Sequence, residues 1–298
     1  MLLFDISDDK VKVARVSAKV LGGESITNYL QKEIKEGLIV KRAIVDQGSL
    51  SKEISSLLGK NFDVKEKEEC AFILHDERVY TLRLRVGQPR NKRVSEIIEE
   101  KVSAFIPEPS DTQIRVFKEV GEGEVQYIAV NKEFFGKYLE LFNSLDLKPT
   151  LAVSEAYALF SLFEPYLKEG ETVFYLNFES TVTDVVVMDK VGVLETFSEA
   201  RAKEKLTGGL IEITSFLKER LGRTPGRIIF GGEGIEEAGV KEFAKNLNIE
   251  PTPAEKIFPA PPVKIDAKSG SVKATEILGF LGLSVLSNQK EPLNLIAP

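Results

Sequence analysis

Two short segments, far apart in the sequence, share one strand–turn–strand pattern, and this repeat constrains the fold more than any other feature. The first, LFDISDDKVKVARV, begins at Leu3, and the second, YLNFESTVTDVVVM, begins at Tyr175. Each has an apolar run that contains Asp5 or Asn177, then a polar turn, then an alternating run rich in β-branched residues, which is typical of a half-buried strand. Because each copy opens one half of the chain, we predict a duplicated α/β domain.

The length of the chain and the order of its other patterns suggest its division. A chain of 298 residues with 43% hydrophobic residues is long enough for two units with separate cores. We predict a first half over residues 1–165, a second half over 166–290 and a short tail over 291–298. A strand–helix–strand–strand pattern predicts a small α+β insertion over about 71–131, and a further strand is expected over 37–45.

The charge and the rare residue types exclude several classes of site. Charges of both signs are interspersed and the net charge is −6, which disfavours a general nucleic-acid or anionic-membrane surface. The single cysteine, Cys70, excludes an intrachain disulfide and a cysteine-rich zinc site. The single histidine, His75, lies between two strand-like runs, and we interpret it as a solvated turn residue in preference to a catalytic one. The apolar run over 277–286 is too short to cross a bilayer, so we expect a soluble chain.

Glycine pairs mark two further places where an anion could bind. Gly208 and Gly209 lie where a loop leads into a helix, and Gly231 and Gly232 lie in a turn between a strand and a helix. Such turns can present backbone N–H groups to a phosphate, but a tight strand-to-helix turn also needs glycine for its backbone alone. The residues leave both interpretations open.

The order of these elements resembles the actin-like nucleotide-binding fold, a duplicated ribonuclease H-like α/β fold. FDISDDKVKV resembles its first phosphate loop, LNFESTVTDVVV its second, VSEAYALF and ATEILGFLGLSV its two connecting helices, and RIIFGGEGI its adenosine motif. The insertion over 71–131 and the segment TGGLIEIT are similar to the type IV pilus assembly protein PilM, a structural cousin of the cytoplasmic part of the secretion protein GspL. The resemblance therefore implies an actin-like fold with a small α+β subdomain inserted in its first half.

The resemblance also implies where a nucleotide would bind if the site is retained. Asp5 would be the Mg²⁺ ligand, and the nucleotide-binding residues would be Asp5, Lys10, Ser180, Thr181, Gly208, Gly209, Gly231 and Gly232. The alternative for the first turn is a charged hairpin turn, in which Asp and Ser side chains bond their own backbone, and we favour it although Asp5 keeps the family's position. The alternative for the second turn is an ordinary hairpin, which we prefer.

Two departures from the family pattern predict that nucleotide binding is weak or lost. Both hairpin turns lack the glycines that let phosphate approach the backbone, and Glu179 and Ser180 stand in their place in the second turn. Asn177 replaces an acidic residue, and carboxylates beside a polyphosphate repel it unless Mg²⁺ intervenes. The family's adenine-clamping subdomain would lie between the TGGLIEIT helix and the RIIFGG strand, and we expect it to be missing. We therefore assign no catalytic residues, favour the absence of enzymatic activity while leaving it open, and expect either no cofactor or residual ATP with Mg²⁺.

The tail contains a segment, LNLIAP, that resembles the short motif with which the pilus protein PilN engages PilM. The resemblance implies a partner-binding peptide formed by Leu293, Asn294, Leu295 and Ile296, whose apolar side chains could fit a groove in extended form. The alternative is an unstructured terminus. If the motif is real, the chain is the cytoplasmic part of a fused PilM–PilN-like protein.

The resemblance implies a scaffold of a type IV pilus or type II secretion-like assembly platform that acts through protein contacts. The groove between the insertion and its parent half is the expected receptor. Expected partners are a PilN-like or GspL/GspM-like membrane protein, the motor ATPase of the machine and a second copy of the chain. The expected location is cytoplasmic and peripheral, at the inner face of the cytoplasmic membrane. Two alternatives remain, a working Mg·ATP-dependent ATPase or switch, and a self-assembling filament protein similar to FtsA.

Overall fold

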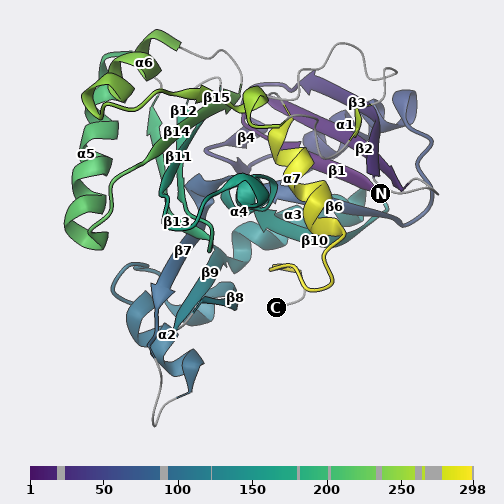
Figure 1. Ribbon diagram of the computed structural model, residues 1–298. Coiled ribbons are helices and arrows are strands. Elements are labelled where there is room, and N and C mark those ends of the chain that lie inside the picture. The colour runs from purple at the N-terminus through teal and green to yellow at the C-terminus, as the bar shows by residue number, and fades with distance from the viewer. Residues whose placement is uncertain are drawn as a thin grey trace.

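The first copy of the repeated hairpin forms the centre of a six-stranded sheet. The computed structural model describes residues 1–18, 24–87, 93–121, 123–179, 182–200, 203–232, 237–258, 264–265 and 277–296. The strand order is β10-β6-β1-β2-β3-β16, with bounds β1 (Leu2–Ile6), β2 (Lys10–Ala18), β3 (Glu24–Glu33), β6 (Glu68–Leu74), β10 (Leu147–Ser154) and β16 (Lys264–Ile265). β1 runs antiparallel to β2 and parallel to β6, and β6 runs parallel to β10 (Figure 1).

The second copy has the same place in a second sheet, so the predicted duplication is confirmed at the level of the strands. This sheet has the order β13-β12-β11-β14-β15, with bounds β11 (Val173–Phe178), β12 (Val182–Met188), β13 (Val193–Ala200), β14 (Arg227–Gly232) and β15 (Thr252–Pro253). β11 runs antiparallel to β12 and parallel to β14. Asn177 pairs with Asp184 across this hairpin, just as Asp5 pairs with Lys12 across the first.

Helices cover both sheets and fill the space between them. Those of the first half are α1 (Gln47–Asn61), α3 (Lys132–Ser144) and α4 (Glu155–Phe163); those of the second half are α5 (Lys203–Leu221), α6 (Glu237–Asn246) and α7 (Leu278–Ser287). Short 3-10 turns occur at η1 (Asp76–Arg78), η2 (Ser110–Thr112), η3 (Glu164–Tyr166) and η4 (Ala254–Lys256). α4 and α7 pack closely where Gly282 contacts the backbone of Ala158. This contact requires glycine, because a Cβ at position 282 would lie 2.0 Å from the Ala158 oxygen. Residues 222–226, all described, connect α5 directly to β14.

The predicted insertion is a small subdomain with its own core, but residues 71–74, expected in it, belong to β6 of the six-stranded sheet. Its sheet has the order β7-β9-β8, with bounds β7 (Val79–Arg85), β8 (Gln113–Gly121) and β9 (Glu124–Asn131), and α2 (Val94–Val102) packs on it. It projects from the two halves in Figure 1. Although it belongs to the first half in sequence, it is bonded to the second. Arg83 donates two hydrogen bonds of 2.7 Å to Asp189, and the Val193 N–H donates to Gln126 Oε1 at 2.8 Å.

Two expectations about strands were incomplete. β3 was not predicted, because its sequence, ESITNYLQKE, alternates too weakly to stand out. The strand expected over 37–45 is instead a tight ladder of β4 (Ile39–Val40) and β5 (Ala43–Ile44). Lys41 and Arg42 form its turn with positive φ angles of 49° and 64°.

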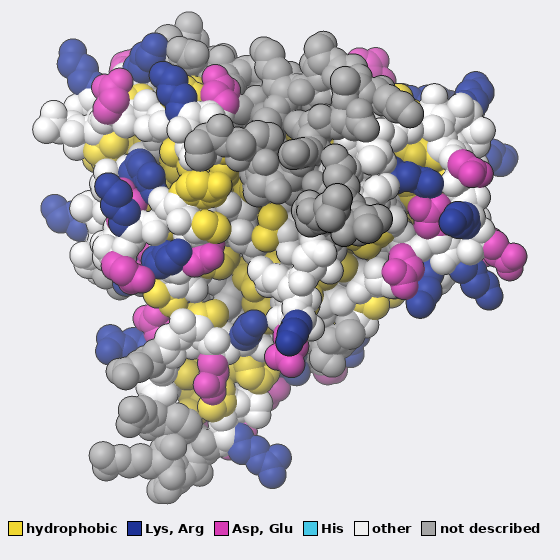
Figure 2. All heavy atoms as spheres, turned by 45° about the vertical axis from the view of Figure 1, so that its right-hand side comes forward, with side chains coloured by type: hydrophobic (Ala, Val, Ile, Leu, Met, Phe, Trp, Pro, Cys, Tyr) yellow, Lys and Arg dark blue, Asp and Glu magenta, His cyan; other side chains and the backbone are white. Residues whose placement is uncertain are grey.

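The surface bears out the interspersed charges of the sequence. Figure 2 shows Lys and Arg side chains among Asp and Glu side chains over the face turned to the viewer. In the part of the chain that the structure describes, no helix is long and apolar enough to cross a bilayer.

Candidate functional site

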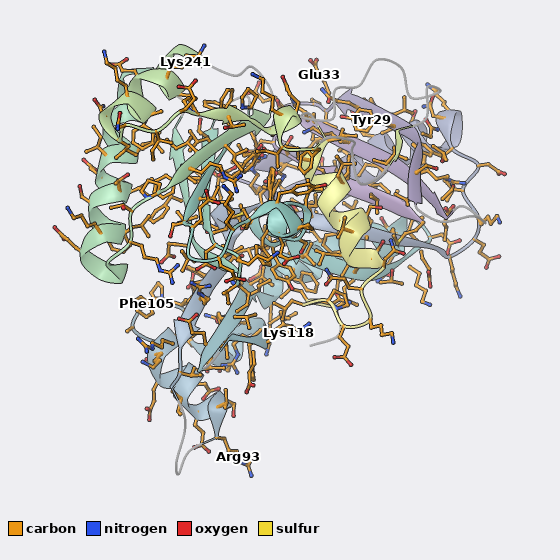
Figure 3. The ribbon with its side chains drawn as sticks, in the orientation of Figure 1. Tyr29, Glu33, Arg93, Phe105, Lys118 and Lys241 are labelled. Carbon is orange, nitrogen blue, oxygen red and sulfur yellow. The ribbon has the colours of Figure 1, made fainter. Side chains whose placement is uncertain are left out.

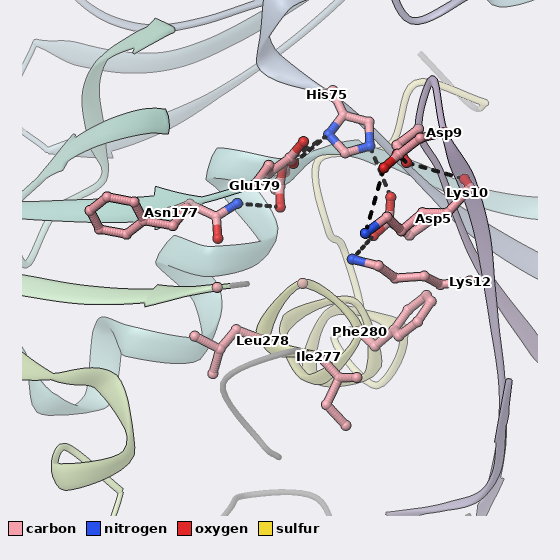
Figure 4. A pocket seen from close by; sticks show the side chains of 15 residues that line it. Asp5, Asp9, Lys10, Lys12, His75, Asn177, Glu179, Ile277, Leu278 and Phe280 are labelled. Atoms are coloured by element: carbon pink, nitrogen blue, oxygen red, sulfur yellow. Dashed lines mark hydrogen bonds and ion pairs between the residues drawn. The ribbon is translucent and has the colours of Figure 1, made fainter. Parts of the chain in front are cut away.

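The ends of parallel strands bring the candidate site residues together between the two halves. β1, β6 and β10 are parallel, so residues at or just after their carboxyl ends meet at one edge of the sheet. These residues are Asp5, His75 and Glu155, and Glu179 follows β11 on the opposite side (Figure 4). The cavity between them has a volume of about 30 Å³, and roughly 10–15 Å³ of such space is needed for one water molecule. There is room for very few water molecules.

His75 is the centre of this site, and the expectation of a solvated turn residue was wrong. Its side chain is 3% exposed. Nε2 lies 2.8 Å from Asp5 Oδ1, while Nδ1 lies 3.1 Å from Glu155 Oε2 and 3.2 Å from Glu179 Oε1. The sequence signal that could have placed it is the buried run AFIL immediately before it, because a residue that follows a central strand emerges at the sheet edge.

Arg42 reaches the same site from the β4–β5 turn, and sequence reasoning missed it. It is buried, and its guanidinium bonds the Glu179 carboxylate as well as Glu77, the latter at 3.1 Å. Its left-handed turn is held by Asp8, whose carboxylate accepts the N–H groups of Lys41 and Arg42, both at 2.7 Å. Asp8 therefore has a structural role in the first turn.

The charges in the site perturb one another strongly. Burial and Arg42 act against protonation of His75, yet the Glu179 and Asp5 carboxylates raise the pKa of His75 well above its usual range. Burial alone would raise the pKa of Asp5, but Lys12, at 3.3 Å, and His75 hold it well below its usual range. Burial likewise opposes ionisation of Glu179, but His75 and Arg42 lower the pKa of Glu179 to about 2. The residue expected to bind Mg²⁺ is thus already paired with cations of the chain.

The pKa of Asp184 is shifted in the opposite direction to those of Asp5 and Glu179. Burial raises the pKa of Asp184 to about 8, and the nearby charges of Glu179 and Glu155 add to the effect. One carboxylate oxygen accepts a hydrogen bond from the Ser198 hydroxyl. The other, Oδ2, is buried and has no hydrogen-bond partner among the described residues.

The remaining predicted nucleotide residues are only partly brought together. Lys10 lines the cavity, with Nζ 3.7 Å from Asp9, and Gly232 lines it with a φ of +99°. A Cβ on Gly232 would lie 2.2 Å from the Phe178 oxygen, so the backbone of the turn requires glycine whether or not a ligand binds. Gly231 precedes it at the end of β14, and Gly208 and Gly209 lie within α5, away from the residues that line the cavity. Ser180 and Thr181 lie outside the described residues.

The tail segment lies along β10, which is the edge strand of the first sheet. Leu293 and Leu295 are buried in the core of the first half. Asn294 Oδ1 accepts the Ala152 N–H at 3.0 Å and its Nδ2 donates to the Thr150 oxygen at 2.8 Å, while the Leu295 N–H donates to the Ala152 oxygen at 3.0 Å. Lys118 of the inserted subdomain, labelled in Figure 3, donates to the Glu291 oxygen at 3.2 Å. The tail thus contacts both the parent half and the insertion.

Comparison with known proteins assigns the fold. No protein-family model matches the sequence, and no curated protein matches it. A structure of the PilM–PilN type IV pilus biogenesis complex is similar with a TM-score of 0.74 at 18% identity, covering 95% of this chain and 97% of that chain. The cytoplasmic domain of EpsL, an inner membrane component of the type II secretion system of Vibrio cholerae, is similar with a TM-score of 0.55 at 9% identity, covering 100% and 98%. A Bacteroides thetaiotaomicron protein with an actin-like ATPase fold and unknown function is similar with a TM-score of 0.54 at 12% identity, covering 86% and 91%. The chain therefore has the actin-like fold, in a form similar to the PilM and EpsL structures.

Proposed function

We propose that the chain is a scaffold of a type IV pilus or type II secretion-like assembly platform that acts through protein contacts and not through a nucleotide. The fold supports the proposal, since it is similar to those of PilM in its complex with PilN and of an inner membrane component of a secretion system. Its partners would be a PilN-like or GspL/GspM-like membrane protein and the motor ATPase of the machine. It would work at the inner face of the cytoplasmic membrane.

The observation that carries the proposal is that the charged side chains expected beside phosphate and metal are paired with one another. Glu179 lies where a glycine would admit phosphate, and it is paired with Arg42 and His75. Arg42 and His75 thus bind a carboxylate of the chain where they could otherwise bind phosphate oxygens. The cavity beside it, of about 30 Å³, leaves little room for a nucleotide, which supports the proposal.

The second support is the docked tail. An exposed edge strand can bind an extended peptide through its backbone, and β10 binds the tail in this way through Ala152. We propose that this edge, beside the inserted subdomain, is the receptor for a PilN-like motif, and that Leu293, Asn294, Leu295 and Ile296 are that motif within the same chain. The arrangement would be that of a fused PilM–PilN-like protein.

Titration of the full chain with Mg·ATP, followed by isothermal calorimetry, tests the loss of nucleotide binding. We expect no binding heat. Micromolar affinity that disappears in Asp5→Ala would favour the ATPase or switch instead. Sedimentation of the same sample tests the filament alternative, which requires concentration-dependent assembly.

A synthetic LNLIAP peptide tests the receptor. We expect it to bind a chain truncated after residue 290, whose folding is first verified by circular dichroism. A peptide with Ala in place of Asn294 is the matched control and is expected not to bind. If the folded, truncated chain does not bind the LNLIAP peptide, the edge of β10 is not a peptide receptor.

A further inference from the structure

We propose that His75, Glu155 and Glu179 form a binding site for a first-row transition-metal cation such as Zn²⁺, which would join the two halves of the fold without a nucleotide. The inference is independent of the proposed function. It rests on the spacing of the three side chains and on the groups that orient them.

The three side chains have the spacing of ligands around one ion. Nδ1 of His75 lies 3.1 Å from Glu155 Oε2 and 3.2 Å from Glu179 Oε1, and the three ligand atoms lie within 4.8 Å of one another. Ligands of a tetrahedral ion with bonds of about 2.1 Å lie about 3.4 Å apart. An imidazole nitrogen with two carboxylate oxygens suits Zn²⁺ and its neighbours better than Mg²⁺, which prefers oxygen. The adjoining cavity, of about 30 Å³, can supply a water as fourth ligand.

Each ligand is oriented by a second group. Asp5 accepts the Nε2–H of His75 at 2.8 Å, which leaves Nδ1 directed at the two carboxylates. Asn177 donates to Glu155 Oε1 at 2.9 Å, and Arg42 bonds Glu179 Oε2. In both cases the oxygen that faces His75 is the other one. A carboxylate on the far nitrogen of a histidine is the usual support of a metal ligand.

Three carboxylates, those of Asp5, Glu155 and Glu179, face the His75 imidazole within 3.2 Å. A proton on Nδ1 of His75 is the competing occupant, because Nδ1 cannot hold a proton and a metal ion together.

The test is a calorimetric titration of the chelator-treated full chain with ZnCl₂. We expect binding at one ion per chain. Glu155→Gln and Glu179→Gln are each expected to lose it, and Asp5→Asn, which changes the support of His75 without removing a ligand, is expected to weaken it about 10–100-fold. Asp9→Asn removes a carboxylate of the same cavity outside the ligand set and should leave the affinity unchanged, as should Cys70→Ser, which removes the only thiol.

The single histidine gives a second readout on the unaltered chain. In protein labelled with ¹⁵N at histidine, one imidazole gives the signals, and Zn²⁺ must remove the proton from Nδ1 while Nε2 keeps its proton. The proposal is overturned if Nδ1 keeps its proton at saturating ZnCl₂. Zinc affinity that persists in folded Glu155→Gln and Glu179→Gln also overturns it. Absence of any binding heat means that the proton alone occupies the site.

Discussion

Replacing Asp184 by asparagine should stabilise the protein at neutral pH, although Asp184 is a buried residue within a sheet. Its side chain is 2% exposed, one oxygen has no hydrogen-bond partner among the described residues, and burial with the charges of Glu179 and Glu155 raises its pKa to about 8. An amide has the shape of the protonated acid and carries no charge. The variant should therefore keep the packing and remove the free-energy cost of holding a proton on Asp184 in the folded state at neutral pH.

The magnitude follows from the difference between the folded and unfolded pKa of Asp184. In the unfolded chain the group titrates at 3.8, and in the folded protein it retains its proton up to about pH 8. The folded state thus binds the extra proton, so stability falls as pH rises from about 4 to about 8 and then levels off. At pH 7 the loss is about 4 kcal/mol, taking about 1.4 kcal/mol per pH unit. We expect Asp184→Asn to recover roughly 2–4 kcal/mol at pH 7 and almost nothing at pH 4.

Urea denaturation at pH 4, 7 and 9, in the presence of a chelator, measures this difference. Asp189→Asn is the matched control from the turn after the same strand. Its carboxylate is bound by Arg83, which outweighs burial and lowers the pKa of Asp189, so its stabilisation is lost as pH falls. Because the buried Arg83 would lose the Asp189 carboxylate but keep Glu124 at 3.3 Å, Asp189→Asn should destabilise by roughly 1–3 kcal/mol at pH 7. If Asp184→Asn is less stable than the unaltered chain at pH 7, Asp184 is a stabilising ion and the reasoning is refuted.

Three smaller predictions concern the tail and the glycines. Asn294→Ala removes two hydrogen bonds to β10 and should cost about 1–3 kcal/mol, which faster hydrogen exchange at the Leu295 N–H would reveal. Gly282→Ala should lower the melting temperature strongly, since its Cβ would lie 2.0 Å from a backbone oxygen of α4; a small change would mean that the two helices can separate. Gly208→Ala should stabilise the protein by about 0.5–1 kcal/mol, because a glycine in a helix costs that much relative to alanine. Gly232→Ala should destabilise it, because Gly232 has a φ of +99°. Equal changes of melting temperature in the two variants would contradict these different roles.

The parts of the fold that could be predicted are those with a local pattern. The two hairpins were recognisable because alternating residues specify a strand, and the apolar run before Glu155 indicated a strand leading into a helix. β3 escaped because its polar residues give no clear alternation. The apolar run before His75 indicated that this residue lies at the end of a central strand, but its environment is made by Asp5, Glu155 and Glu179, which only the fold brings together.

Arg42 illustrates the same limit for the site. The sequence around it is apolar and predicts a strand, and its entry into the cleft depends on a left-handed turn held by Asp8 from a different hairpin. The absence of glycine in the second hairpin was visible in the sequence. The guanidinium that pairs with Glu179 there was not.

The pair between Arg83 and Asp189 has a mechanical consequence. Two halves joined only along a cleft can turn about their connection like the leaves of a hinge. Here the inserted subdomain, whose chain belongs to one leaf, is bonded to the other leaf by Arg83 and Gln126, at a distance from the cleft network. Turning would have to break both attachments at once. A force applied to one half should therefore move both halves together as one rigid body and should not open or close the cleft.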